Sequence, residues 1–130
     1  MNSITKGLSV LALGLASSVA LAAPTYLVTH NTTDVESNAY VNNKIPSNHP
    51  TRAHSDGRVN WNLVRIACFG STTNGKCPAM IKMATNTSQP FNLGMVYLDL
   101  SSGDITPKSL SANGYTITVN GPGEATLSKN

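Results

Sequence analysis

Charged side chains are scarce in this sequence. Only 12% of its 130 residues are charged, nine basic against six acidic, whereas 40% are hydrophobic. A chain with this balance is neither an acidic disordered protein nor a basic tail. The six scattered acidic residues give no spacing that predicts two facing carboxylates for glycoside hydrolysis. The net charge of +3 is too small and too dispersed for a nucleic-acid surface, so we expect no nucleic-acid partner.

Long apolar runs are equally rare, and the clearest one lies at the N-terminus. Lys6 precedes an apolar stretch from Leu8 to Val19, and Ala20-Leu21-Ala22 offers a small-x-small cleavage site. Crossing a bilayer takes about twenty apolar residues, more than this stretch contains. We therefore predict a signal peptide over residues 1–22, cleaved before Ala23, and no transmembrane segment after it. The protein would then be exported to the periplasm or the extracellular space.

The sequence has only two cysteines, Cys68 and Cys77. In an exported protein such a pair favours a disulfide over a metal or redox site, and two cysteines allow only one pairing. Eight residues separate them, unlike the short spacing of redox and zinc motifs. We predict a structural disulfide at the base of a hairpin.

Helical patterns are also missing. From Ala23 onward the chain has 13 Asn, 13 Thr and 10 Ser among 108 residues, a composition suited to turns and to solvent-facing strand positions. The clearest element is Tyr115–Val119, where apolar residues alternate with threonines after Asn113-Gly114. Such alternation indicates a strand with one buried face. We predict a single all-β domain over residues 23–130, an antiparallel two-sheet sandwich, immunoglobulin-like or similar, of about seven or eight short strands.

The other strands follow from the same alternation, and we expect no helix. In the longest, Val59 to Cys68, the apolar side changes near Leu63-Val64, which predicts a bulge or burial of both faces. Ala39–Val41 is expected at a sheet edge. The remaining predicted strands are Pro24–Thr29, Ala79–Thr85, Leu93–Leu100, Ile105–Thr106 and Ala125–Leu127.

The segment between the cysteines is the first candidate functional site. Its Asn74-Gly75 pair is a strong turn signal, and a stapled tip loses little entropy on binding. In the alternative, the loop is an inert connection and Phe69 folds back over the core. We predict ligand binding by this tip through an apolar anchor, small polar groups and a cation, which are Phe69, Thr72, Thr73, Asn74 and Lys76.

The second candidate is the long stretch from Asn42 to Arg58, which contains His49, His54 and Asp56. Long ordered loops are disproportionately functional. Two imidazoles and a carboxylate suit a transition metal, and His30 could join them if the first strand ends nearby. A small metal-binding or hydrolytic protein built on these residues is therefore an alternative hypothesis. Their spacing matches no helical ligand motif, and no nucleophile signature is present, so we expect neither a catalytic residue nor a cofactor.

Aromatic residues make up only 5% of the chain, and their positions bear on sugar binding. Three of them alternate in phase with apolar neighbours and are predicted to be buried, namely Trp61, Tyr97 and Tyr115. Three others are left free of the core pattern, namely Tyr40, Phe69 and Phe91.

Taken together, these features predict a small exported, non-catalytic binding or structural module whose partner is a protein or a surface glycan. A further alternative is a self-associating surface subunit that pairs through an exposed edge at Ala39–Val41. No feature of the sequence specifies an oligomeric state.

Overall fold

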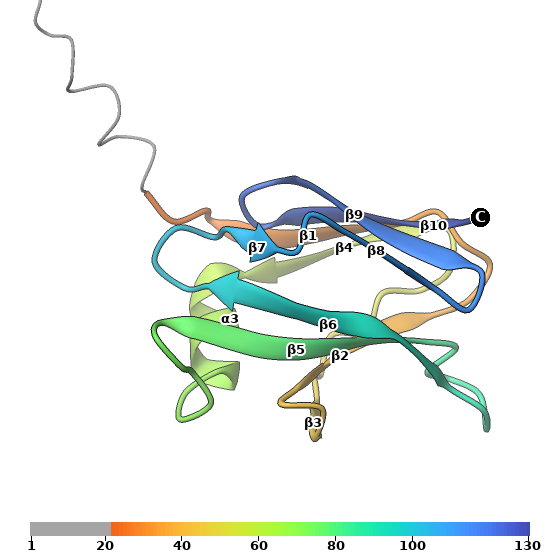
Figure 1. Cartoon of the computed structure of the whole chain (residues 1–130), viewed down its shortest axis with the longest axis horizontal. Coiled ribbons are helices and arrows are strands. Elements are labelled where there is room, and N and C mark those ends of the chain that lie inside the picture. Colours follow the sequence, from red (N-terminus) through yellow and green to blue (C-terminus); the bar gives the residue numbers. More distant parts are fainter. Residues whose placement is uncertain (1–21) are drawn as a thin grey trace, which may run out of the picture.

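The computed structural model describes residues 22–130 and shows two five-stranded sheets packed face to face (Figure 1). One sheet has the strand order β4-β1-β10-β9-β8, and the other has the order β3-β2-β5-β6-β7. This arrangement confirms the predicted all-β two-sheet sandwich. The predicted signal peptide lies, apart from Ala22, outside the described residues.

The first sheet is antiparallel except at one pair of neighbours. Strands β1 and β10 run parallel, with Val28 opposite Glu124, so the first and last strands of the domain lie side by side. The turn between β8 and β9 contains Asn113 and Gly114, both at positive φ, as expected for a tight hairpin turn. The strands of this sheet are β4 (Ser55–Asn60), β1 (Tyr26–Asn31), β10 (Glu124–Lys129), β9 (Tyr115–Gly121) and β8 (Ser109–Ala112).

The second sheet shows that the predicted edge at Ala39–Val41 is wrong. Two residues of β3 pair with β2, Ser47 N–H donates to the carbonyl of Ala39, and Thr51 bridges to Ser37. Because β2 is covered in this way, pairing with another chain through it loses its basis. The strands of this sheet are β3 (Ile45–Pro46), β2 (Ser37–Val41), β5 (Lys76–Met83), β6 (Phe91–Asp99) and β7 (Ile105–Thr106).

A short helix, α3 (Trp61–Ala67), occupies most of the predicted strand Val59–Cys68. The Asn60 side chain accepts a hydrogen bond from the N–H of Asn62 at 2.9 Å and caps the helix. Trp61, Val64 and Cys68 are buried, and their spacing places them on one helical face. The change of apolar side near Leu63-Val64 therefore marks a helix rather than a bulge, and the expectation of no helix was wrong.

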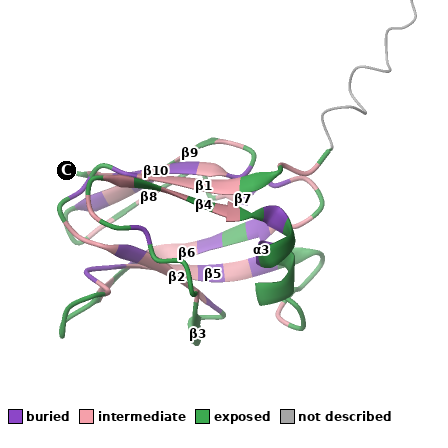
Figure 2. Ribbon diagram, turned by 180° about the vertical axis from the view of Figure 1, so that it is seen from behind, coloured by how far each residue is buried: buried purple, intermediate pink, exposed green. Residues whose placement is uncertain are grey.

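The core lies between the sheets and extends under α3, as the buried residues in Figure 2 show. Trp61 and Tyr115 are buried as predicted, whereas Tyr97 is 44% exposed. An irregular register between β5 and β6 beside Gly94 explains the difference. Val96 and Leu98 face the core, so the intervening Tyr97 lies on the outer face.

Candidate functional site

One end of the sandwich carries α3, the disulfide and the loop that they bound, and we call residues 61–77 the disulfide end. Trp61 anchors α3 there: its indole Nε1–H donates to the carbonyl of Leu100 at 3.0 Å. The side chain of Arg65 reaches the same carbonyl at 3.3 Å. The helix is thus tied to the turn after β6 as well as packed on the core.

The predicted disulfide between Cys68 and Cys77 is present, with 5.9 Å between the two Cα atoms. Both half-cystines are buried. Cys68 directly follows α3 and Cys77 lies in β5. The bond therefore joins the end of a helix to a strand, which corrects the expectation that it closes the base of a hairpin.

The loop between the two cysteines is ordered by its own hydrogen bonds. Thr73 and Lys76 exchange two backbone hydrogen bonds, of 2.9 and 3.1 Å, around Asn74 and Gly75. Both of these turn residues have positive φ, as the Asn-Gly signal predicts. The carbonyl of Gly75 also accepts from the N–H of Leu100 at 3.1 Å. The tip is consequently held against the body of the protein.

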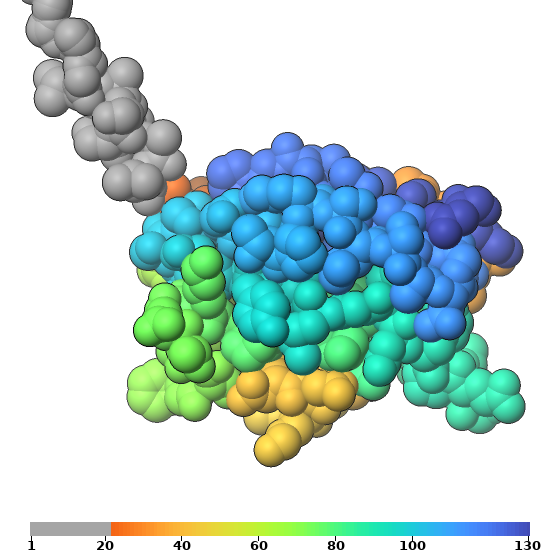
Figure 3. Space-filling model, viewed as in Figure 1, coloured from red at the N-terminus to blue at the C-terminus, as the bar shows by residue number. Residues whose placement is uncertain are grey.

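Three large apolar side chains are exposed at this end. Leu63 is 45% exposed, Ile66 70% and Phe69 89%. Phe69 therefore does not cover the core. Thr72, Thr73, Asn74 and Lys76 are exposed beside it, and Figure 3 shows this green segment projecting from the body. The sequence prediction named Phe69 but missed Leu63 and Ile66, because a strand pattern assigned them to buried faces.

The three candidate metal ligands between Asn42 and Arg58 do not come together. His49 lies beside a cavity between the sheets, whereas His54 has positive φ in the turn before β4 and donates its N–H to the carbonyl of Thr33. Asp56 is on β4 and contacts His30. Over residues 22–130, no group of three or more His, Cys, Asp or Glu residues is placed to hold a metal ion.

His30 forms the main cluster of titratable groups, on the outer face of the first sheet. Its Nδ1 lies 2.9 Å from Asp56 Oδ1 and its Nε2 lies 2.6 Å from Glu124 Oε2. These hydrogen bonds, to Glu124 first and Asp56 second, raise the pKa of His30 above its ordinary value. Since both ring nitrogens are engaged, neither is free to accept a proton from a substrate.

At the opposite end, polar side chains are buried, and we call Asn31, Thr33, Ser37 and Thr51 the polar end. Asn31 makes four hydrogen bonds: its oxygen accepts from the Thr33 N–H and hydroxyl, and its nitrogen donates to the carbonyls of Val35 and Thr51. Thr51 and Ser37 exchange two backbone hydrogen bonds. This network joins the two sheets.

Nearby, the hydroxyl of Tyr115 donates to Asp34 at 3.1 Å. That hydrogen bond is the main cause of the lowered pKa of the Asp34 carboxyl. The pKa of Tyr115 is raised, mainly by burial and secondly by the same hydrogen bond.

None of the helices among the described residues has the length and apolar character needed to cross a membrane. Two comparisons with known proteins place the chain in context. A family model described as "T2SS substrate NttC" matches residues 1–130. The chain is also similar to the crystal structure of the Legionella pneumophila type II secretion system substrate NttC, with 62% sequence identity and a TM-score of 0.82. That match covers 83% of this chain and 100% of the other. No match to a curated protein was found.

Proposed function

The chain belongs to the NttC family of type II secretion system substrates, and from this premise we propose that it is a secreted, non-catalytic module that binds a protein partner through its disulfide end. Membership of the family implies export, which agrees with the sequence prediction. Passage through the periplasm and release by the type II system follow from the family description. The observation that carries the binding proposal is the exposure of Leu63, Ile66 and Phe69 on one covalently fixed segment.

Exposed apolar side chains of this size are unusual in clusters. Single exposed apolar residues are common on protein surfaces, but a group of them marks an interaction site. At the disulfide end, Phe69 lies three residues after Ile66 in the sequence, and its N–H donates to the carbonyl of Ile66. The polar residues of the 72–76 loop would form a rim around them, as in protein interfaces.

The chemistry of this surface favours a protein over a glycan. Sugar rings stack on aromatic faces, and Phe69 is the only aromatic side chain that is exposed at the disulfide end. Leu63 and Ile66 are aliphatic and offer no hydrogen bond to a hydroxyl group. An apolar patch on a partner protein matches them better. The disulfide limits motion of the surface, which reduces the entropy lost on binding.

The proposal is tested by capture with matched variants. We expect Phe69→Ala and Lys76→Ala each to reduce capture of an extracellular partner, with the larger loss, about tenfold or more, at the apolar anchor. Thermal stability should be nearly unchanged, because both side chains are exposed. Tyr97→Ala, which removes an exposed aromatic ring from the outer face of β6, is the control.

Capture is measured by incubating the immobilised wild type and variants with intact cells and quantifying the retained proteins by mass spectrometry. A partner that is retained equally by the wild type and Phe69→Ala would overturn the proposal. Capture that disappears after glycosidase treatment of the cells would show a glycan partner instead. A large loss of stability in Phe69→Ala with unchanged capture would give that residue a structural role only.

A further inference from the structure

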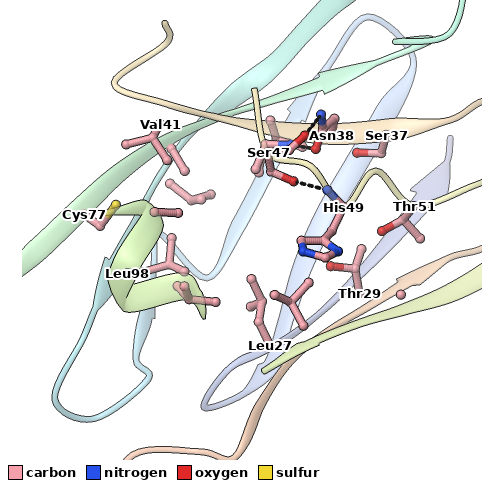
Figure 4. Close-up of a pocket in the computed structure, with 18 of the residues that line it drawn as sticks. Leu27, Thr29, Ser37, Asn38, Val41, Ser47, His49, Thr51, Cys77 and Leu98 are labelled. Carbon is pink, nitrogen blue, oxygen red and sulfur yellow. Dashed lines mark hydrogen bonds between the residues drawn. The ribbon is translucent and has the colours of Figure 1, made fainter. Parts of the chain in front are cut away.

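A cavity of about 390 Å³ lies between the two sheets (Figure 4). Protein interiors are normally packed without voids larger than a water molecule. A space of this size falls within the range of roughly 300–1,000 Å³ that is typical of small-molecule sites. It therefore needs an explanation beyond imperfect packing.

The cavity is lined by small residues from both sheets. Ala39 and Ala79 line it from the second sheet, and Gly57 and Ala125 line it from the first. A Cβ atom added to Gly57 would lie 2.5 Å from Oγ1 of Thr51, so a larger residue there would displace the segment that closes this side. Small residues on both sheets keep the space open.

The cavity runs from the disulfide end to the polar end of the sandwich, and it opens to solvent. Val64 and the disulfide line it from the disulfide end, and Thr51 lines it from the polar end. Exposed residues also line it, among them Ile45 and Ile66. A molecule could therefore enter between β3 and α3 without unfolding of either sheet.

The two ends of the cavity differ in polarity. Val41, Cys77 and Leu98 lie together at one side of Figure 4. Ser47 and His49 lie at the other side, where the N–H of His49 donates to the Ser47 hydroxyl at 2.9 Å. Of the described residues that line the space, none is Asp, Glu, Lys or Arg. The lining thus matches a molecule with one apolar end and one small polar end.

We propose that the cavity binds a single-chain amphiphile, an unbranched aliphatic chain with one small polar head. The chain would lie beside Ala39, Ala79 and Leu98, and the head would hydrogen-bond at His49 and Ser47. A peptide fits less well, because its backbone groups would meet no hydrogen-bond partners at the apolar end. The entrance of the cavity shares Leu63 and Ile66 with the protein-binding surface proposed above, but neither proposal depends on the other.

A series of saturated fatty acids gives the sharpest test. Octanoate, decanoate, dodecanoate, tetradecanoate and hexadecanoate are titrated into the exported protein by calorimetry, below their micelle concentrations. Each methylene that enters an apolar site should lower Kd about fourfold. We expect this gain to stop once the chain fills the cavity, with one molecule bound per protein. Affinity that rises along the whole series, or no binding at any length, would overturn the proposal.

A variant that fills the cavity provides the structural control. Ala39→Phe places a ring in the space and should weaken binding of the best ligand at least tenfold. Thr118→Phe adds the same group on the outer face of β9, where the side chain is exposed, and should leave Kd unchanged. Equal loss in the two variants, or no loss in either, would contradict the assignment.

A measurement without substitutions keeps the test decisive if Ala39→Phe does not fold. Amide spectra recorded with and without dodecanoate should show shifts at Ala39, Ala79 and Ala125, and none at Thr118. Shifts confined to the outer faces would reject the site. Vesicles of phosphatidylglycerol distinguish the source of the chain. Sedimentation with them that Ala39→Phe abolishes and Thr118→Phe retains indicates an acyl chain of a membrane lipid, whereas binding of the free acid alone indicates a soluble amphiphile.

Discussion

The two ends of the sandwich are stabilised by different kinds of bond. At the disulfide end a covalent bond fixes a helix that leaves Ile66 and Phe69 in solvent. At the polar end Asn31 and Thr51 are buried, and hydrogen bonds satisfy them. Apolar side chains that stay exposed contribute no burial energy to folding. At the disulfide end, the crosslink therefore holds the helix in place. An end with no such surface can rely on a buried polar network.

The largest expected effect tests the polar end. Asn31→Ala should lower the free energy of unfolding by about 3 kcal/mol, because the buried N–H of Thr33 loses its acceptor and a cavity is left. Urea denaturation measures the change. Asn120→Ala is a matched control, since Asn120 is exposed and, within residues 22–130, its side chain bonds only to Thr126. A loss below about 1 kcal/mol for Asn31→Ala would mean that the network contributes little.

The next effect tests the disulfide end. Replacing both Cys68 and Cys77 by alanine should cost about 2.5 kcal/mol, as expected for the entropy of a short closed loop. Hydrogen exchange then sharpens the comparison between the ends. Amides of α3 should exchange faster in the variant, while the amide of Thr33 should change only in step with global stability. Uniform acceleration at both ends would show that they are not independent.

The smallest effect concerns His30, which lies beside the polar end on the outer face. Its pKa is raised in the folded protein by hydrogen bonds to Glu124 and Asp56. The stabilisation is therefore complete below the ordinary value of 6.5 and is lost as the pH rises through the folded value.

His30→Gln tests this expectation. The melting temperature of the wild type should fall as the pH rises from 6.5 through the folded pKa of His30. The variant should not show this fall. Identical pH profiles for wild type and variant would show that the cluster is too exposed to matter.

Much of the fold was predictable from local patterns. The alternation at Tyr115–Val119 predicts a strand, and the pairs Asn74-Gly75 and Asn113-Gly114 predict turns. Each of these signals depends on only a few neighbouring residues, and the structure contains the strand and both turns. The helix was missed because Val59, Trp61 and Leu63 also fit a period of two. Its signal was nevertheless present, since Asn60 is a good helix cap and Trp61, Val64 and Cys68 recur at helical spacing.

The candidate sites depend on contacts that the sequence does not show. The disulfide pairing followed from there being only two cysteines, but its attachment to a helix depended on recognising α3. The cavity requires Ala39 and Ala125 to lie on the inner faces of two different sheets, which no local pattern specifies. His30 was linked to Asp56 only conditionally, and its contact with Glu124 arises from the parallel pairing of β1 with β10.

That parallel pairing also limits when the first sheet can be completed during folding. β1 lies between β4 and β10, so one of its two neighbours is the last strand of the described domain. A chain that leaves the ribosome or crosses a membrane from its N-terminus cannot complete this sheet until Glu124–Lys129 arrives. Contacts of such long sequence separation slow folding. The first sheet therefore stays incomplete until β10 is available, and a truncation of β10 would leave β1 with an unpaired edge.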